Sequence, residues 1–163
     1  MGLFGFGKKK TIFTAPVSGQ FQSLENVEDE VFSQKLMGEG YGIIPDNNKI
    51  YSPISGTVSS IFETKHALGI TTNAGLEVLV HMGIDTVELN GEPFNIMVKK
   101  GEKVDKDKQL AEMDLDNIKS KNYGTVVLTI ITNVQDKVKN LKFLTKESNK
   151  IEAGHEVLEI KNN

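Results

Sequence analysis

Short runs of apolar and β-branched residues, separated by Gly, Asn, Ser and Pro, divide the chain, and few segments have a sustained helical period. Short runs bounded by turn residues are typical of antiparallel β proteins. We expect strands over residues 50–61, 68–72, 76–82, 125–132 and 157–160. Short helices or single helical turns are expected over residues 27–37, 115–121 and 134–141. The predicted fold class is all-β with a few short helical turns.

A weak internal repeat indicates that this β structure is duplicated. Ala15–Gly19 (Ala-Pro-Val-Ser-Gly) recurs as Ser52–Gly56 (Ser-Pro-Ile-Ser-Gly). The Gly-x-x-Val spacing of Gly101–Val104 also recurs in Gly154–Val157. Two similar β units can cover each other's strand edges. The repeat therefore predicts an antiparallel β-sandwich of the barrel-sandwich type with internal duplication.

Length and composition limit the classes of function. A chain of 163 residues with 38% hydrophobic residues can fill the core of one domain. It contains no cysteine, which excludes disulfides and thiolate chemistry and fits a reducing, cytoplasmic location. All 19 basic residues are lysines and the net charge is -3, so we expect no nucleic-acid partner.

The N-terminus differs from the rest of the chain. Residues 1–10 place Leu3, Phe4 and Phe6 among glycines, followed by Lys8–Lys10. We expect a flexible tail here, followed by one domain over residues 11–163. Weak association with an anionic membrane through residues 1–10 is the alternative, because lysines are attracted to acidic headgroups and aromatic rings enter the interface.

Two histidines flank a predicted turn at Asn73–Gly75. If the flanking strands pair so that Thr72 faces Gly75, His66 lies opposite His81. Directly opposed side chains share one face of a sheet, with Cβ atoms roughly 4.5–5.5 Å apart. The spacing therefore predicts that two imidazole rings meet.

Two imidazoles this close cannot both carry a charge easily, so at least one should be neutral near pH 7. His81 could attack a phosphoryl group, while His66 donates a hydrogen bond to the phosphate oxygens. A hydroxyl such as that of Thr64 could support the site. The same pair, His66 and His81, could instead provide two ligands to zinc, although zinc sites normally have three or four protein ligands. We expect no required cofactor, and zinc at the histidine pair is kept as an open alternative.

The segments around the two histidines identify a family. Phe62–Ala67 (Phe-Glu-Thr-Lys-His-Ala) and Glu77–Gly91, with its Val-His-Met-Gly-Ile-Asp-Thr-Val-Glu-Leu core, resemble the glucose-type IIA component of the bacterial phosphoenolpyruvate-dependent sugar phosphotransferase system. The resemblance extends from Ala15 to Gly154. It implies a single IIA domain over residues 11–163 that transfers phosphoryl groups during sugar uptake.

The resemblance also implies roles for individual residues. His81 would carry the phosphoryl group on Nε2, with His66 orienting it and Thr64 bonding in the same site. Asp85 and Asp29 would meet an arginine of the donor, the histidine-containing phosphocarrier protein, and the acceptor would be the cysteine of the IIB domain of a sugar permease. Regulatory partners are left open. The apolar rim of the site, which would contact these partners, matches Val31, Phe32, Met37, Phe62, Leu79 and Val87.

Other functions compete with this interpretation. Residues 98–104 and 110–113 are similar to half of a lipoyl or biotinyl carrier domain, but we expect Lys65 to lie beside a strand, far from the hairpin tip that such a carrier requires. A zinc peptidase of a related sandwich fold would need a His-x-His motif, which the sequence lacks. Gly38–Gly42 lacks the lysine and following helix of a phosphate-binding loop, and we expect it to form a loop between strands.

Overall fold

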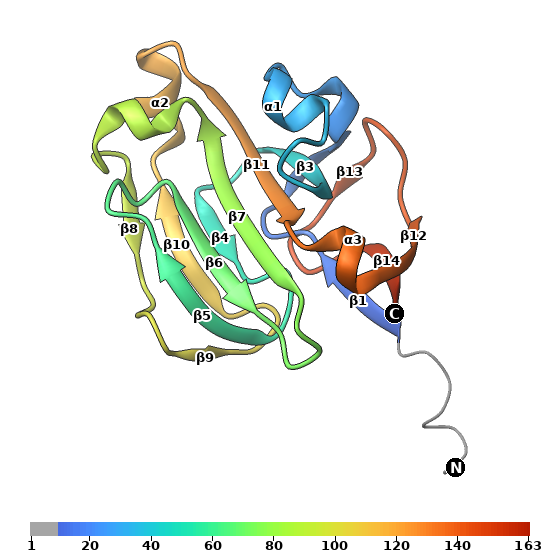
Figure 1. Cartoon of the computed structure of the whole chain (residues 1–163). Coiled ribbons are helices and arrows are strands. Elements are labelled where there is room, and N and C mark those ends of the chain that lie inside the picture. The colour runs from blue at the N-terminus through green and yellow to red at the C-terminus, as the bar shows by residue number, and fades with distance from the viewer. Residues whose placement is uncertain (1–9) are drawn as a thin grey trace.

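The computed structural model describes residues 10–163 and confirms an antiparallel β architecture with short helices (Figure 1). The strands are β1 (Lys10–Thr14), β2 (Gly19–Ser23), β3 (Glu39–Pro45), β4 (Lys49–Tyr51), β5 (Gly56–Ile61), β6 (Ala67–Thr71), β7 (Glu77–Ile84), β8 (Phe94–Ile96), β9 (Lys103–Val104), β10 (Gln109–Met113), β11 (Gly124–Ile131), β12 (Val138–Phe143), β13 (Lys150–Ile151) and β14 (Glu156–Asn162). The helices are η2 (Leu24–Asn26), α1 (Glu30–Ser33), η3 (Thr86–Leu89), α2 (Leu115–Ser120) and α3 (Val134–Lys137).

Residues 1–9 of the expected N-terminal tail lie outside the described residues. The tenth residue, Lys10, was also placed in the tail but is the first residue of β1, where it pairs with Lys161 of β14. Lys10 is therefore part of a paired strand and not of the tail.

Three sheets form the fold. One has eight strands in the order β13-β2-β3-β11-β7-β6-β5-β9, and two have three strands, β1-β14-β12 and β4-β10-β8. In Figure 1 the small sheets lie on either side, and the adjacent strands β7 and β11 run between them. Buried side chains from all three sheets form the main core, which includes Phe13, Tyr41, Ile50, Ile70 and Met82.

The predicted duplication is present, and one β unit is inserted into the other. Strands β4 to β10 form a continuous unit, while β1 to β3 and β11 to β14 form the second unit around it. Within the large sheet, the order β13-β2-β3-β11 of one unit is repeated by β9-β5-β6-β7 of the other. The two units therefore meet where β7 pairs with β11.

Backbone hydrogen bonds show that the two units are related by an approximate twofold axis. The Thr14 amide donates to the Pro53 carbonyl over 3.0 Å, and the Tyr51 amide donates to the Pro16 carbonyl over 2.7 Å. The proline of each repeated Pro-x-Ser-Gly turn thus accepts a bond from the residue two positions before the proline of the other turn. These reciprocal bonds explain the first sequence repeat.

The second predicted repeat, Gly101–Val104 with Gly154–Val157, does not match equivalent positions of the two units. The Gly101 amide donates to the Val58 carbonyl over 2.7 Å, and the matching bond in the other unit runs from Ser148 to Phe21 over 2.9 Å. Gly101 is therefore equivalent to Ser148 and not to Gly154. Gly101 and Ser148 both have positive φ, 91° and 71°. The two units therefore share a turn conformation at this position and not a residue type.

Three predicted elements differ from the structure. The strand expected over residues 50–61 is broken into β4 and β5 by Ser52–Ser55, because Pro53 cannot donate a ladder hydrogen bond. The helix expected over 134–141 ends at Lys137, where β12 follows directly. Gly38–Gly42 was expected to be a loop, but Glu39 onward belongs to β3.

The glycines of β3 have a packing role. A Cβ atom on Gly40 would lie 1.8 Å from the Thr129 carbonyl oxygen of the neighbouring β11, and one on Gly42 would lie 2.9 Å from Val126 Cγ2. Glycine in this strand thus permits a close approach between β3 and β11.

We predict that Gly40→Ala lowers the free energy of unfolding by about 2–3 kcal/mol, because the new methyl group meets backbone rather than a movable side chain. Gly101→Ala is the control, since no atom lies within 4 Å of its Cβ position and only its φ of 91° is unfavourable. It should cost about 1 kcal/mol. Urea unfolding of both variants tests this, and equal losses would contradict the packing role.

Candidate active site at a histidine pair

His81 lies near the centre of the large sheet, on β7. Its partner across the strands is Ala67 of β6 on one side and Leu128 of β11 on the other. Side chains directly opposite each other share one face. The fully buried Ala67 is small and leaves space beside the His81 ring, whereas Leu128 closes the other side with an apolar wall.

The predicted strand register was wrong by one residue. Thr72 pairs with Leu76 rather than Gly75: the Thr72 amide donates to the Leu76 carbonyl over 3.0 Å. Gly75 adopts a φ of 89° and completes the longer loop Asn73–Gly75. The residue opposite His81 is consequently Ala67, and not His66.

The two imidazole rings nevertheless meet, as predicted. Their centroids are 5.0 Å apart with an interplanar angle of 82°. His66 precedes β6, and Lys65 before it has a φ of 59°, so the chain turns there instead of following regular strand alternation. The Thr64 hydroxyl lies 2.7 Å from His66 Nδ1 and holds the ring in place.

Two aromatic rings border the histidines. The Phe32 ring of α1 lies 4.9 Å from the His81 ring at 60°, and the Phe62 ring lies 5.3 Å from the His66 ring at 80°. Phe32 is buried and Phe62 is 43% exposed. The rings therefore make the site apolar on both sides, with its open side near Phe62.

Burial favours neutral histidines. Burial is the main cause that lowers the pKa of His81 to about 4, and the nearby His66 adds to this lowering. The Gly83 backbone and the Asp29 charge partly oppose it by raising the pKa. Burial also lowers the pKa of His66. Both rings are therefore neutral at pH 7, so each offers an unprotonated nitrogen.

The two nitrogens of His81 differ in accessibility. Nδ1 is buried and has no hydrogen-bond partner of good geometry among residues 10–163. Nε2 makes no hydrogen bond in this part of the chain either, but it is not buried. The nitrogen that can reach a second molecule is therefore Nε2.

The predicted apolar residues lie at two depths, and the structure shows Phe32 and Phe62 directly beside the histidine rings. Phe32 and Leu79 are buried and form a second small core with Leu128 and Ile130, beneath the histidine pair. The others are about 40% exposed or more and can contact a partner: Val31, Met37, Phe62 and Val87. The sequence alone does not point to Leu128 or Ala67, because only strand pairing places them beside His81.

The two aspartates have different surroundings. The Asp29 carboxylate accepts hydrogen bonds from the amides of Val31 (2.9 Å) and Phe32 (3.2 Å), so it caps α1. Asp85 is exposed, has a φ of 60°, and makes no capping bond to η3. Asp85 is therefore the better placed of the two carboxylates to meet a cation on another molecule.

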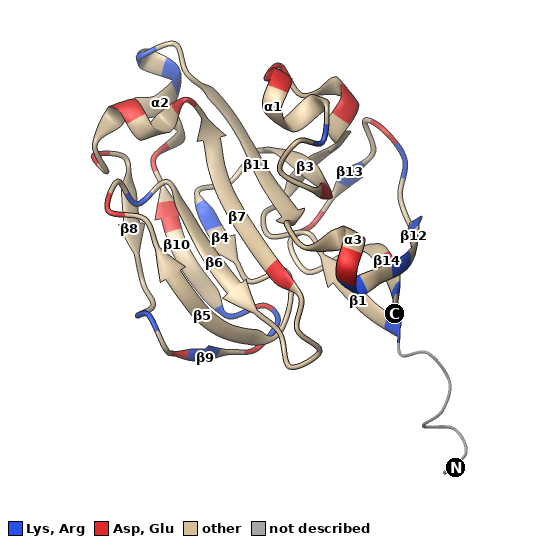
Figure 2. Cartoon of the chain, in the orientation of Figure 1, with Lys and Arg blue, Asp and Glu red and all other residues tan. Residues whose placement is uncertain are grey.

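Figure 2 shows acidic residues along the segment that carries α1, where Glu25, Glu28, Asp29 and Glu30 follow one another closely. Asp85 and Glu88 lie at the far end of β7, beyond His81. Carboxylates thus occur on the segment that carries Phe32 and at the end of the strand that carries His81. Such a surface is complementary to a partner with apolar and basic groups.

No group of three or more metal-ligating side chains occurs in the described part of the chain. Zinc at His66 and His81 would thus need ligands from another molecule, and that interpretation stays a prediction.

The expectation that Lys65 lies beside a strand, far from a hairpin tip, was wrong. Lys65 lies in the loop that joins β5 to β6. The hairpin position alone does not identify a swinging-arm lysine.

Comparison with known proteins identifies the family. Residues 11–137 match the family model for the phosphoenolpyruvate-dependent sugar phosphotransferase system, EIIA 1. The chain therefore belongs to this EIIA family, as its sequence motifs indicated. None of the described helices is long and apolar enough to span a membrane.

Individual relatives agree with this assignment. The chain is 43% identical to a glucose-specific EIIA component of Staphylococcus aureus over 80% of this chain and 81% of that protein. It is 52% identical to a glucose-specific EIICBA component of Streptococcus pneumoniae over 76% of this chain, which spans only 17% of that longer protein. The structure of glucose permease IIA from Mycoplasma capricolum matches with a TM-score of 0.82 and 31% identity, over 94% of this chain and 97% of that one.

The lowered pKa of His81 predicts a pH-dependent stability. A histidine that is neutral when folded but titrates near 6.5 when unfolded contributes stability that is present above pH 6.5 and is lost as the pH falls toward 4. In His81→Gln this loss should be smaller by roughly 2 kcal/mol between pH 6.5 and 4. Urea unfolding across this range is the measurement, and identical pH profiles would contradict the pKa shift.

Proposed function

We propose that the chain is a phosphotransferase component that carries a phosphoryl group on His81 during sugar uptake. The donor is the histidine-containing phosphocarrier protein, and the acceptor is the cysteine of the IIB domain of a sugar permease. The observation that carries the proposal is the pair of neutral imidazoles 5.0 Å apart. Of the two nitrogens of His81, Nδ1 is buried and Nε2 is the accessible one. The glucose-specific names of the relatives support glucose as the sugar.

In the proposed reaction the Nε2 lone pair of His81 attacks the phosphorus atom. A bond forms between Nε2 and phosphorus, while the bond to the donor's histidine nitrogen breaks and its electron pair returns to the donor ring. In the second step a cysteine thiolate of the acceptor attacks the phosphorus atom. A sulfur–phosphorus bond forms while the Nε2–phosphorus bond breaks, and the electron pair of the broken bond returns to His81. His81 keeps its Nδ1 proton throughout, so neither step needs an external acid or base.

His66 is suited to orient the phosphate. If Thr64 donates its hydroxyl proton to His66 Nδ1, the neutral His66 ring carries its own proton on Nε2. That N–H can donate to a phosphate oxygen bound on the neighbouring His81. Since burial keeps His66 neutral, it orients the phosphate by a hydrogen bond without adding a strong charge that would hold it.

The absence of arginine from the sequence fits a carrier that must release its phosphate. Phosphate held by bidentate arginine contacts would be strongly stabilised. Here the neighbours are the Phe32 ring, the His66 ring and the Thr64 hydroxyl. Such a site does not hold the phosphate by a strong ionic contact, so transfer to His81 and transfer from His81 can both proceed.

The proposed partners and location follow from this role. The apolar rim with its acidic surroundings would receive both donor and acceptor, and residues 10–163 would act as a single cytoplasmic IIA domain. Zinc bound by His66 and His81 remains a separate proposal, in which the metal would compete with phosphorylation for Nε2. Membrane association through residues 1–10 and contacts with regulatory partners are further proposals.

We predict that His81→Gln abolishes labelling by phosphoenolpyruvate in the presence of the two general upstream proteins. His66→Gln should still accept the label, because Nε2 of His81 is unchanged. Its onward transfer to a IIB domain should be slower by roughly 10–100-fold, the effect of one lost hydrogen bond to a phosphate. If the His81→Gln variant becomes labelled, or if His66→Gln transfers its label at the normal rate, the assigned roles are wrong.

Asp85→Asn should weaken docking of the donor without slowing the chemical step. We expect KM for the donor to rise roughly 3–10-fold at low ionic strength, with kcat unchanged, because the lost charge lies on the rim. Glu112→Gln, on β10 and away from the histidines, is the control. If both variants behave like the wild type, or kcat falls instead of KM rising, Asp85 is not a docking residue.

A further inference from the structure

Lys35 joins both ends of segment 25–39, which carries α1 and places Phe32 against His81. Lys35 follows α1, and its Nζ lies 2.8 Å from Glu25 Oε1 and 3.1 Å from Glu39 Oε2. Glu25 belongs to η2 near the start of this segment, and Glu39 is the first residue of β3 at its end. A single ammonium group therefore links the exit from β2 to the return into β3.

The backbone around Lys35 is adapted to this contact. Its φ is 60°, in the left-handed region that a lysine seldom adopts. Its amide donates to the Phe32 carbonyl over 3.0 Å, so the turn is tied directly to the residue whose ring lies on His81. The ion pairs with Glu25 and Glu39 offset the cost of this conformation.

The linked segment carries the groups that contact His81. The Phe32 ring lies 4.9 Å from the His81 ring, and Asp29 acts on the His81 charge from the start of α1. The segment is also anchored by the buried side chains of Leu24, Val27 and Phe32 itself. These anchors lie before or within α1. Between α1 and β3, Lys35 is the residue whose side chain makes ion pairs, and these pairs tie this part of the segment to both of its ends.

We propose that Lys35 is a positioning residue that closes the segment 25–39 over His81 and keeps the Phe32 ring against the reactive imidazole. Its effect on a phosphorylated ring rests on the function proposed above. When the segment is closed, Phe32 excludes water from one side of the phosphoimidazole. When it opens, a water oxygen can attack phosphorus, the Nε2–phosphorus bond breaks, and inorganic phosphate is released.

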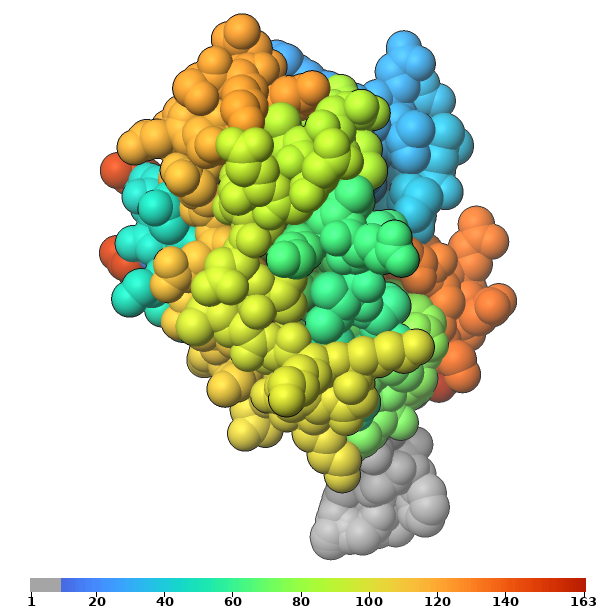
Figure 3. All heavy atoms as spheres, turned by 90° about the vertical axis from the view of Figure 1, so that its left-hand side faces the viewer, coloured from blue at the N-terminus to red at the C-terminus, as the bar shows by residue number. Residues whose placement is uncertain are grey.

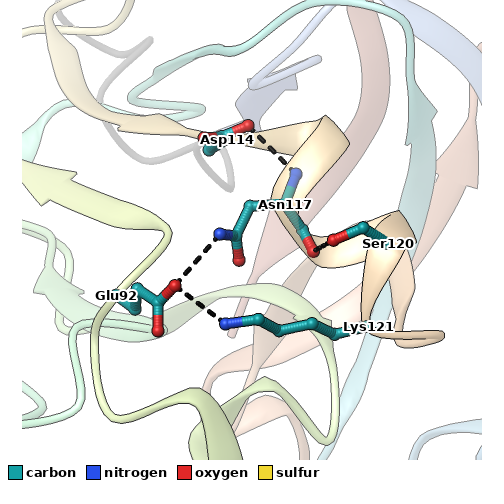
Figure 4. Close-up of polar contacts among 5 residues, drawn as sticks. All are labelled: Glu92, Asp114, Asn117, Ser120 and Lys121. Carbon is teal, nitrogen blue, oxygen red and sulfur yellow. Dashed lines mark hydrogen bonds and ion pairs between the residues drawn. The ribbon is translucent and has the colours of Figure 1, made fainter.

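The chain offers a closely matched control for removal of this lysine. Lys121 Nζ lies 2.8 Å from Glu92 Oε1, and Figure 4 shows this pair beside Asn117 of α2. The lysine side chains are 38% exposed in both pairs, and Glu25 and Glu92 are 60% and 59% exposed. The α2 end of the molecule and the α1 segment lie apart in Figures 1 and 3.

The first measurement uses the unphosphorylated full chain. The NMR signals of the His81 ring report on Phe32, because an aromatic ring shifts the resonances of protons near it. We expect Lys35→Met to move the His81 signals, Lys35→Arg to restore them, and Lys121→Met to leave them at the wild-type position. Unchanged signals in Lys35→Met, or an equal change in Lys121→Met, would overturn the proposal.

The second measurement is the lifetime of the label on His81 after removal of the upstream proteins. Lys35→Met should lose it roughly three-fold faster than wild type, which corresponds to about 0.7 kcal/mol and lies within the range of an exposed ion pair. Lys35→Arg should be near wild type and Lys121→Met unchanged. Equal lifetimes in Lys35→Met and wild type would overturn the link to the phosphoryl group.

These two measurements separate the proposals. If wild-type His81 accepts no label, the proposed function fails, yet the NMR comparison still decides whether Lys35 holds Phe32 in place. If wild type is labelled and the His81 signals do not depend on Lys35, the positioning role fails while the carrier function stands. A thermal melt of each variant shows whether the whole fold is intact, so that loss of folding is not mistaken for loss of positioning.

Discussion

The antiparallel pairing of β7 with β11 is the interaction on which the rest of the structure depends. It joins the two related β units at the centre of the eight-stranded sheet and places Leu128 directly across from His81. The approximate twofold axis therefore passes beside the site. The loop Phe62–His66 joins β5 to β6 in one unit, and the segment with α1 joins β2 to β3 in the other. Two equivalent connections thus converge on His81, one from each unit.

The environment of the pair explains how an ordinary side chain becomes a reactive one. Phe32, Leu79 and Leu128 remove water from the His81 ring, and removal of water disfavours the charged imidazolium. The neutral ring keeps a lone pair on the accessible Nε2. The apolar surroundings extend through His66 to the exposed Phe62 ring, so the environment that lowers the pKa of His81 reaches a surface that a partner can cover.

Local sequence patterns predicted the strands well where turn residues bound them, as at β6, β7 and β11, but they could not determine the register. Whether Thr72 faces Gly75 or Leu76 depends on the conformation of Gly75, which composition does not reveal. The two rings still meet because Lys65 turns the chain before β6. The ion pairs of Lys35 were not foreseen either, because Glu25 and Glu39 come together only when β2 and β3 pair.

The sequence by itself determined the family, the duplicated β architecture and the identity of the two histidines, because motifs and turn residues act over short stretches of chain. Tertiary structure decided which residues face His81, which of its nitrogens is accessible, and how deeply each apolar neighbour is buried. Those properties depend on strands that are far apart in the sequence, such as β7 and β11, and on the α1 segment that packs over them. Burial and strand pairing are therefore what convert a recognisable motif into a site with defined chemistry.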